Sequence, residues 1–140
     1  MRHRFITAFR VFIACFFALA SAFCIRVQHA YKLASLVGKH TYYLYTASSQ
    51  AVTKTTVLPW EIFRVQGESV TLENADPVSI ATRFGGEQVC VERVDGVVSY
   101  YYRVDAWQGG IVIAGELVNL HIAVSEQCVV VGTPVIFGGF

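Results

Sequence analysis

Few side chains in this 140-residue chain are suited to catalysis. One of them is His121, the single histidine inside the expected sheet region. His121 lies in VNLHIAV, and strand alternation puts it on the face opposite Leu120 and Ile122. A catalytic histidine needs a nucleophile or a carboxylate beside it, and the spacing of residues places neither there. We therefore interpret His121 as a histidine on the surface of a sheet.

Three glutamates and two serines are the other candidates for chemistry. Glu87, Glu92 and Glu116 could pair as acid and base in a glycosidase or muramidase, but charges on strands are ordinarily solvated. Ser48 and Ser49 lie outside any Ser-x-x-Lys or Gly-x-Ser-x-Gly context. We predict a protein that is not an enzyme and that uses no metal or cofactor. An envelope hydrolase acting on peptidoglycan or peptide is the alternative.

Aromatic residues suggest a binding surface. A strand through Tyr100, Tyr101 and Tyr102 points the first and third rings to one face. Such rings could bind glycan or peptide, or they could simply form cross-strand pairs that stabilise the sheet. The tail, with its two glycines before the last residue, could dock on a sheet edge or engage a partner. The candidate interaction surface comprises Tyr42, Tyr45, Tyr100, Tyr102, Trp107 and Phe140.

Cysteine usage leaves two interpretations open. Cys15 and Cys24 lie in the N-terminal apolar segment, whereas Cys90 and Cys128 lie in strand-like runs. The latter pair could form a disulfide in an exported protein, or each could be a free, buried thiol. The chain has no Cys-x-x-Cys motif, which argues against a zinc or redox site.

Residues 1–25 have the order of an export segment, either a signal peptide or a signal anchor. Arg2, Arg4 and Arg10 precede an uncharged apolar run over 11–25. Fifteen residues make about 22 Å of helix, short of a roughly 30 Å bilayer core, but a span that begins at Phe5 would cross it. Small residues ending at Ala22 fit signal peptidase, so cleavage and retention both remain open. Either way the remainder is expected outside the cytoplasm.

The remainder divides into a basic linker over 26–39 and a single domain over 40–140. From His40 onward, five basic residues face all ten acidic ones, which gives a net charge of −5. A nucleic-acid-binding domain needs a Lys/Arg patch, so nucleic acid is excluded as a partner. The linker carries cations that could contact anionic headgroups.

The pattern of elements predicts an α+β fold, with an antiparallel-rich sheet and one or two short helices on one face. The N-terminal hydrophobic helix precedes it. Asp76 as N-cap, Pro77 and the closing Gly85 define a two-turn helix, with Val78, Ile80, Ala81 and Phe84 on its buried face. A helical turn over 59–65 is expected to carry Trp60 and Phe63 into the core. Strands are expected at 41–47, 51–58, 68–73, 87–94, 97–104, 111–114, 117–124 and 127–131, the fourth and fifth joined by an Asp-Gly turn.

Three segments near the C-terminus, VVSYYYRVDAW, VNLHIAV and VGTPVIFGGF, resemble the YwmB family of exported proteins from endospore-forming Gram-positive bacteria. The similar region covers about 90–140, and longer family members carry an N-terminal half that this chain mostly lacks. The resemblance implies an α+β fold similar to the TATA-box-binding protein sheet and no enzyme activity. DNA binding does not follow from that fold.

These observations predict a non-enzymatic, extracytoplasmic interaction or structural module, membrane-anchored or secreted and associated with sporulation. Its expected partners are the membrane, through the N-terminal helix, and an envelope protein or glycan. A glycan- or peptide-binding sheet that uses surface tyrosines is a further alternative, and it requires those rings to face solvent.

Overall fold

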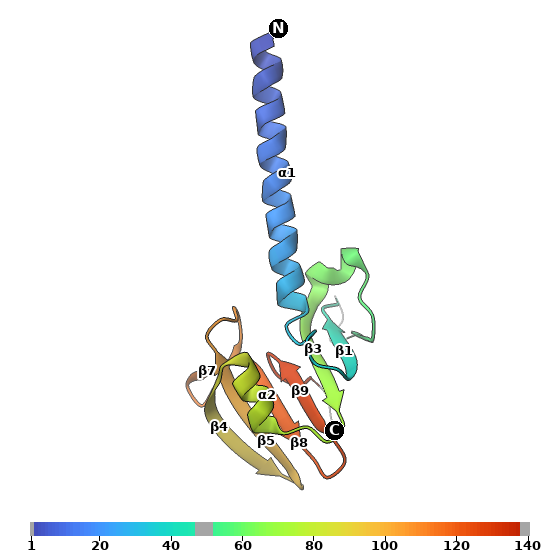
Figure 1. Ribbon diagram of the computed structural model, residues 1–140, viewed down its shortest axis with the longest axis vertical. Coiled ribbons are helices and arrows are strands. Elements are labelled where there is room, and N and C mark those ends of the chain that lie inside the picture. The colour runs from blue at the N-terminus through green and yellow to red at the C-terminus, as the bar shows by residue number, and fades with distance from the viewer. Residues whose placement is uncertain (1, 47–51, 138–140) are drawn as a thin grey trace.

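A long helix stands away from a β domain in the computed structural model, which describes residues 2–46 and 52–137 (Figure 1). Helix α1 (Arg2–Ala30) runs straight into the domain at its C-terminal end. The helical elements that follow are the 3₁₀ helix η1 (Pro59–Arg64) and the helix α2 (Pro77–Phe84). The strands are β1 (Lys39–Leu44), β2 (Val52–Lys54), β3 (Val65–Leu72), β4 (Gly86–Val94), β5 (Val97–Val104), β6 (Ile111–Ile113), β7 (Glu116–Val118), β8 (Leu120–Val124) and β9 (Val129–Thr133).

Seven of these strands form one antiparallel sheet in the order β2-β1-β3-β9-β8-β5-β4, and β6 pairs with β7 in a small second sheet. The α+β prediction is therefore confirmed. The sequence places β3 and β9 far apart, yet they are neighbours, with Glu68 opposite Thr133. His40 lies in β1, so His121 is not the only histidine in the sheet. The expected strand over 51–58 is reduced to the three residues of β2, and Ser48 and Ser49 lie outside the described residues.

Helix α2 forms where its local signals predict it. The Asp76 carboxylate accepts a hydrogen bond from the Ser79 N–H at 2.8 Å, and Gly85 ends the helix with φ of 67°. Ile80 and Ala81 are buried against the sheet, whereas Val78 is exposed, so its expected place on the buried face is wrong. The helix covers the face formed by β5, β8 and β9 (Figure 1).

The main core lies between that face of the sheet and α2. Leu120, Ile122 and Val131 supply its fully buried centre. Leu33 and Leu36 also belong to this core, although they come from the segment expected to be a linker. Residues 26–39 therefore pack into the domain: α1 continues to Ala30, and the turns after it place two leucines against the sheet.

A second, smaller core forms at the base of α1, where η1 joins the domain. Ala30 of the helix packs there with Leu44 and Ile62. The expected burial of Trp60 and Phe63 is wrong, because these side chains are 72% and 53% exposed. In a 3₁₀ helix positions i and i+3 share one side, and this side points away from the core.

The opposite face of the sheet is covered by the chain that follows β9. Its side chains fit over two glycines: a Cβ on Gly67 would lie 2.7 Å from the Phe137 ring, and one on Gly132 would lie 2.6 Å from Cγ1 of Ile136. Phe137 also packs against Tyr43, with ring centroids 5.3 Å apart. The segment up to Phe137 therefore packs on a face of the sheet, whereas the tail expected to dock, the two glycines and Phe140, lies outside the described residues.

The cysteines of the domain are both free thiols. Cys90 lies on β4 and Cys128 immediately precedes β9, and β5 and β8 lie between these strands. Three strand spacings separate them by about 14 Å, well beyond the Cα separation that a disulfide spans. The disulfide alternative is therefore excluded within one chain.

Candidate functional site

The most distinctive surface of the molecule is α1 itself. Large apolar side chains such as Phe12, Phe16 and Leu19 are exposed along it. The stretch Ile6–Ala30 is long and apolar enough to cross a membrane. Its 25 residues make about 37 Å of helix, which exceeds a bilayer core of about 30 Å. An N-terminal helix of this kind is consistent with a signal sequence or a membrane anchor.

A buried carboxylate fixes the chain that follows α1. Glu68 of β3 is only 1% exposed, and it accepts a hydrogen bond from the Leu33 N–H at 2.9 Å. Its other oxygen lies 2.8 Å from Nδ1 of His40, whose Nε2 lies 3.0 Å from the Leu36 carbonyl oxygen. The His40 ring therefore bridges the Glu68 carboxylate and the backbone that follows α1. Sequence analysis missed this group because Glu68 reads as an ordinary polar strand residue.

The same buried carboxylate affects a neighbouring tyrosine. Burial, together with the charge of Glu68, raises the pKa of Tyr42. Tyr42 is therefore a neutral, buried ring beside the end of α1, where it packs edge-on against Tyr31 with centroids 5.4 Å apart. This part of the junction is a folded core.

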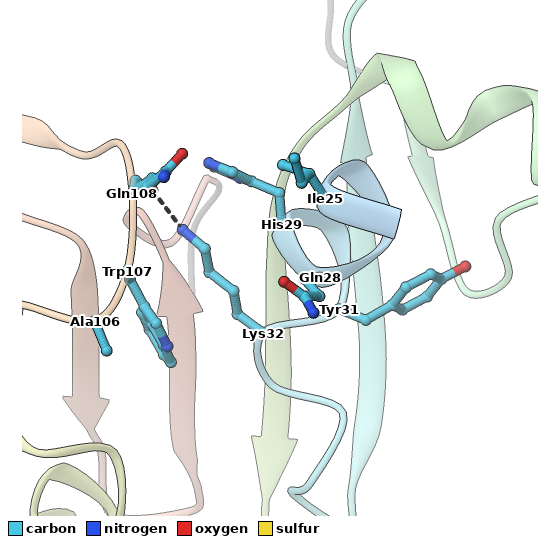
Figure 2. A pocket seen from close by; sticks show the side chains of 8 residues that line it. All are labelled: Ile25, Gln28, His29, Tyr31, Lys32, Ala106, Trp107 and Gln108. Atoms are coloured by element: carbon cyan, nitrogen blue, oxygen red, sulfur yellow. Dashed lines mark hydrogen bonds between the residues drawn. The ribbon is translucent and has the colours of Figure 1, made fainter. Parts of the chain in front are cut away.

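A cleft of about 550 Å³ opens between the end of α1 and the loop that follows β5 (Figure 2). Lys32 crosses it: Nζ donates a hydrogen bond to the Gln108 carbonyl oxygen at 2.8 Å and lies 5.4 Å from the Trp107 ring centroid. Burial lowers the pKa of Lys32 to about 8. Lys32 thus ties the loop to the base of α1 through one hydrogen bond and one cation–π contact.

A second cleft of about 400 Å³ shares His29, Lys32 and Gln108 with the first and extends toward Gly67 and Phe137. The described residues that line the two clefts include no acidic side chain. Gly109 adopts φ of 78° and passes His29 closely, since a Cβ there would lie 3.4 Å from the ring. The two clefts are therefore weakly basic hollows at the end of the domain where α1 enters it.

His121 is placed differently from the prediction. It is buried, its ring stacks on Tyr101 with centroids 4.5 Å apart, and its Nδ1 accepts a hydrogen bond from the Ile136 N–H at 3.3 Å. Nε2 has no hydrogen-bond partner among the described residues. Burial lowers the pKa of His121 to about 4, so the ring is neutral. The surface-histidine interpretation is wrong because the segment after β9 folds over the ring.

The three candidate glutamates do not converge. Glu87 lies 2.6 Å from Arg103, and Glu116 lies 3.9 Å from the same guanidinium, beside a small exposed hollow of about 270 Å³. Glu92 instead accepts a hydrogen bond from the Tyr101 hydroxyl at 3.2 Å. A guanidinium between two exposed carboxylates is an ordinary surface ion-pair network, and it leaves no enclosed space for a substrate.

The aromatic candidates do not form a single exposed face. Tyr42 and Tyr102 are buried, and Tyr100 stacks beside Tyr102 with centroids 6.5 Å apart, partly buried against the main core. Tyr45 is 64% exposed, whereas Trp107 is half-buried against Phe84, at a centroid distance of 5.1 Å. The tyrosines therefore do not supply the solvent-facing row that a glycan-binding sheet requires.

The described residues contain no group of three or more His, Cys, Asp or Glu side chains that could hold a metal ion. Their most distinctive feature is the exposed helix fixed to a β domain. Comparison of the chain with known protein families, with curated proteins and with solved structures finds no match.

Proposed function

We propose that this protein is a membrane-anchored, extracytoplasmic module that acts by binding another component of the cell envelope, without catalysing a reaction. The observation that carries the proposal is the contrast along α1. Its apolar run is exposed, whereas its last turn and the residues after it are built into both cores of the domain. Such a helix holds the domain close to the bilayer.

The way in which α1 joins the domain supports retention of the anchor. Residues 2–30 form one continuous helix, and Phe23 packs against Phe63 with ring centroids 6.2 Å apart. Cleavage after Ala22 would leave Phe23 and Ile25, both exposed apolar side chains, at the start of a chain in water. Retention keeps these side chains in lipid.

The surroundings of the candidate catalytic groups support an interaction role. The neutral His121 is covered by the C-terminal segment, and the glutamates are paired at exposed positions.

The resemblance of residues 90–140 to the YwmB family adds a role in an endospore-forming bacterium, at the envelope and during sporulation. In this proposal the partner is an envelope protein or glycan.

Crosslinking in the native envelope tests the proposal. A photo-crosslinking residue at Tyr45 or Val112, both exposed, should capture a partner in the membrane fraction. Substitution of Glu87 or Glu116 by Gln should leave that product and the cellular phenotype unchanged. Loss of the phenotype from either substitution, with the fold preserved, would instead support the hydrolase alternative.

A further inference from the structure

The helix η1 exposes its two aromatic side chains and buries a carboxylate, although Ile62 packs into the smaller core in the usual way. Its residues Trp60 and Phe63 point outward, with exposures of 72% and 53%, while Glu61 is buried. Glu61 is satisfied there, because it forms an ion pair with Lys54 and accepts a hydrogen bond from the Leu58 N–H at 3.1 Å. A segment that buries its carboxylate and exposes its aromatic rings is suited to an apolar environment.

The outward side chains adjoin the membrane helix. The Phe63 ring meets Phe23, and Arg26 donates a hydrogen bond to the Phe63 carbonyl oxygen at 2.9 Å. Figure 1 shows η1 beside the end of α1, on the side of the domain toward the helix. The surface formed by Leu58, Trp60 and Phe63, here called the η1 patch, is therefore continuous with the exposed apolar surface of α1.

The depth of the η1 patch along α1 matches the edge of a bilayer. Phe23 lies two positions before Ile25, where the apolar run ends, which is about 3 Å along a helix. Tryptophan prefers the boundary between lipid and water, where its ring is partly apolar and its N–H can reach a polar group. Arg26 and Arg64 flank the patch, and their charges suit anionic headgroups.

We propose that the η1 patch inserts into the outer interface of the lipid bilayer beside α1 and so gives the domain a second point of attachment. This inference rests on the proposed function, in which α1 is embedded in the membrane. Two attachment points, one helix and one interfacial patch, restrict rotation of the domain about the helix axis. The face covered by α2 and the edge strand β4 would then keep a fixed orientation relative to the membrane.

Tryptophan fluorescence tests the insertion, because the chain has only two tryptophans. Full-length protein is reconstituted into vesicles of phosphatidylcholine and phosphatidylglycerol whose acyl chains are brominated near the headgroup. Trp107→Phe leaves Trp60 as the only tryptophan, and Trp60→Phe leaves Trp107. Trp107 is half-buried between Phe84 and Lys32 and does not belong to the η1 patch, so it serves as the comparison ring.

We expect brominated lipid to quench Trp60 several-fold more strongly than Trp107, in protein that floats with the vesicles. Equal quenching of the two rings in floating protein would overturn the inference and leave the anchor intact. The inference would also be overturned if Trp60 were shielded from iodide, a quencher dissolved in the water, and yet not quenched by the brominated lipid. That result would indicate that a second copy of the chain or another protein covers the η1 patch. Failure to float would instead contradict the proposed anchor.

A difference measurement covers the case in which Trp107→Phe does not fold, since Trp107 packs against Phe84. Subtracting the emission of Trp60→Phe from that of the unchanged protein gives the contribution of Trp60 without altering Trp107. The same comparison of quenching then applies.

Discussion

At the scale of single residues, two buried ionisable groups have opposite surroundings. Glu68 has two hydrogen-bond partners, the Leu33 N–H and the His40 ring. His121 is neutral, and its Nε2 has no partner among the described residues. A buried charge is tolerated when it is paired, whereas an unpaired titratable group gives up its charge.

Glu68→Gln should weaken the junction between α1 and the sheet. The amide can still accept from Leu33, but it no longer supplies the charge that pairs with His40, so we expect a loss of about 1–3 kcal/mol in the free energy of unfolding. Urea unfolding of the full-length protein in detergent micelles measures this change. Glu73→Gln, at an exposed position of the same segment, is the matched control and should change stability by less than about 0.5 kcal/mol. Equal stability of the two variants would contradict the role given to Glu68.

His121 should make the protein less stable as the pH falls. Its pKa is about 4 in the folded protein and about 6.5 in the unfolded chain, so the unfolded chain binds the extra proton in this range. Stability from this group is complete above pH 6.5 and decreases toward pH 4 by about 2–3 kcal/mol.

His121→Phe retains a ring beside Tyr101 but cannot titrate. The other titratable groups are the same in the variant and in the unchanged protein. The difference between the two proteins in the pH dependence of the free energy of unfolding therefore isolates the contribution of His121. The variant should lose less stability between pH 6.5 and 4 than the unchanged protein. Parallel profiles would show that His121 is accessible to protons in the folded state.

At the scale of elements, the segment after β9 closes one face of the sheet. Gly132→Ala should displace it, because the new Cβ would lie 2.6 Å from Cγ1 of Ile136 and 2.9 Å from the Ile136 backbone nitrogen. We expect a loss of about 1–3 kcal/mol. The pKa of His121, followed by NMR, should rise from about 4 toward its ordinary value as the ring becomes hydrated.

Ile136→Ala removes the closest of these atoms, so it should recover part of the loss when combined with Gly132→Ala. Fully additive effects of the two substitutions, or an unchanged pKa of His121, would show that the segment does not cover the ring.

The elements that could be predicted from the sequence are those specified by neighbouring residues. Asp76, Pro77 and Gly85 define α2 within ten positions, and Asp95-Gly96 turns β4 into β5 with φ of 49° and 81°. The burial of Glu68 and His121 depends on chain segments at least 15 positions away, from the end of α1 and from beyond β9. No local pattern carries that information. Trp60 and Phe63 are expected in the core because large aromatic side chains are highly buried on average, and no local pattern shows which side of η1 faces the sheet.

At the scale of the whole molecule, the proposed function depends on the orientation of one helix. In the proposed arrangement, the apolar run of α1 crosses the bilayer, the arginine-rich start stays in the cytoplasm, and the domain of net charge −5 lies outside. In this arrangement the η1 patch faces the membrane surface.

The most direct measurement combines protease digestion of intact cells with mass spectrometry of the protein in the membrane fraction. The account predicts that the domain is digested from outside and that the full-length protein begins in the N-terminal segment, before Ala22. A domain that is digested only after the cells are broken, or a chain that starts at Phe23 and is found in the medium, would contradict it.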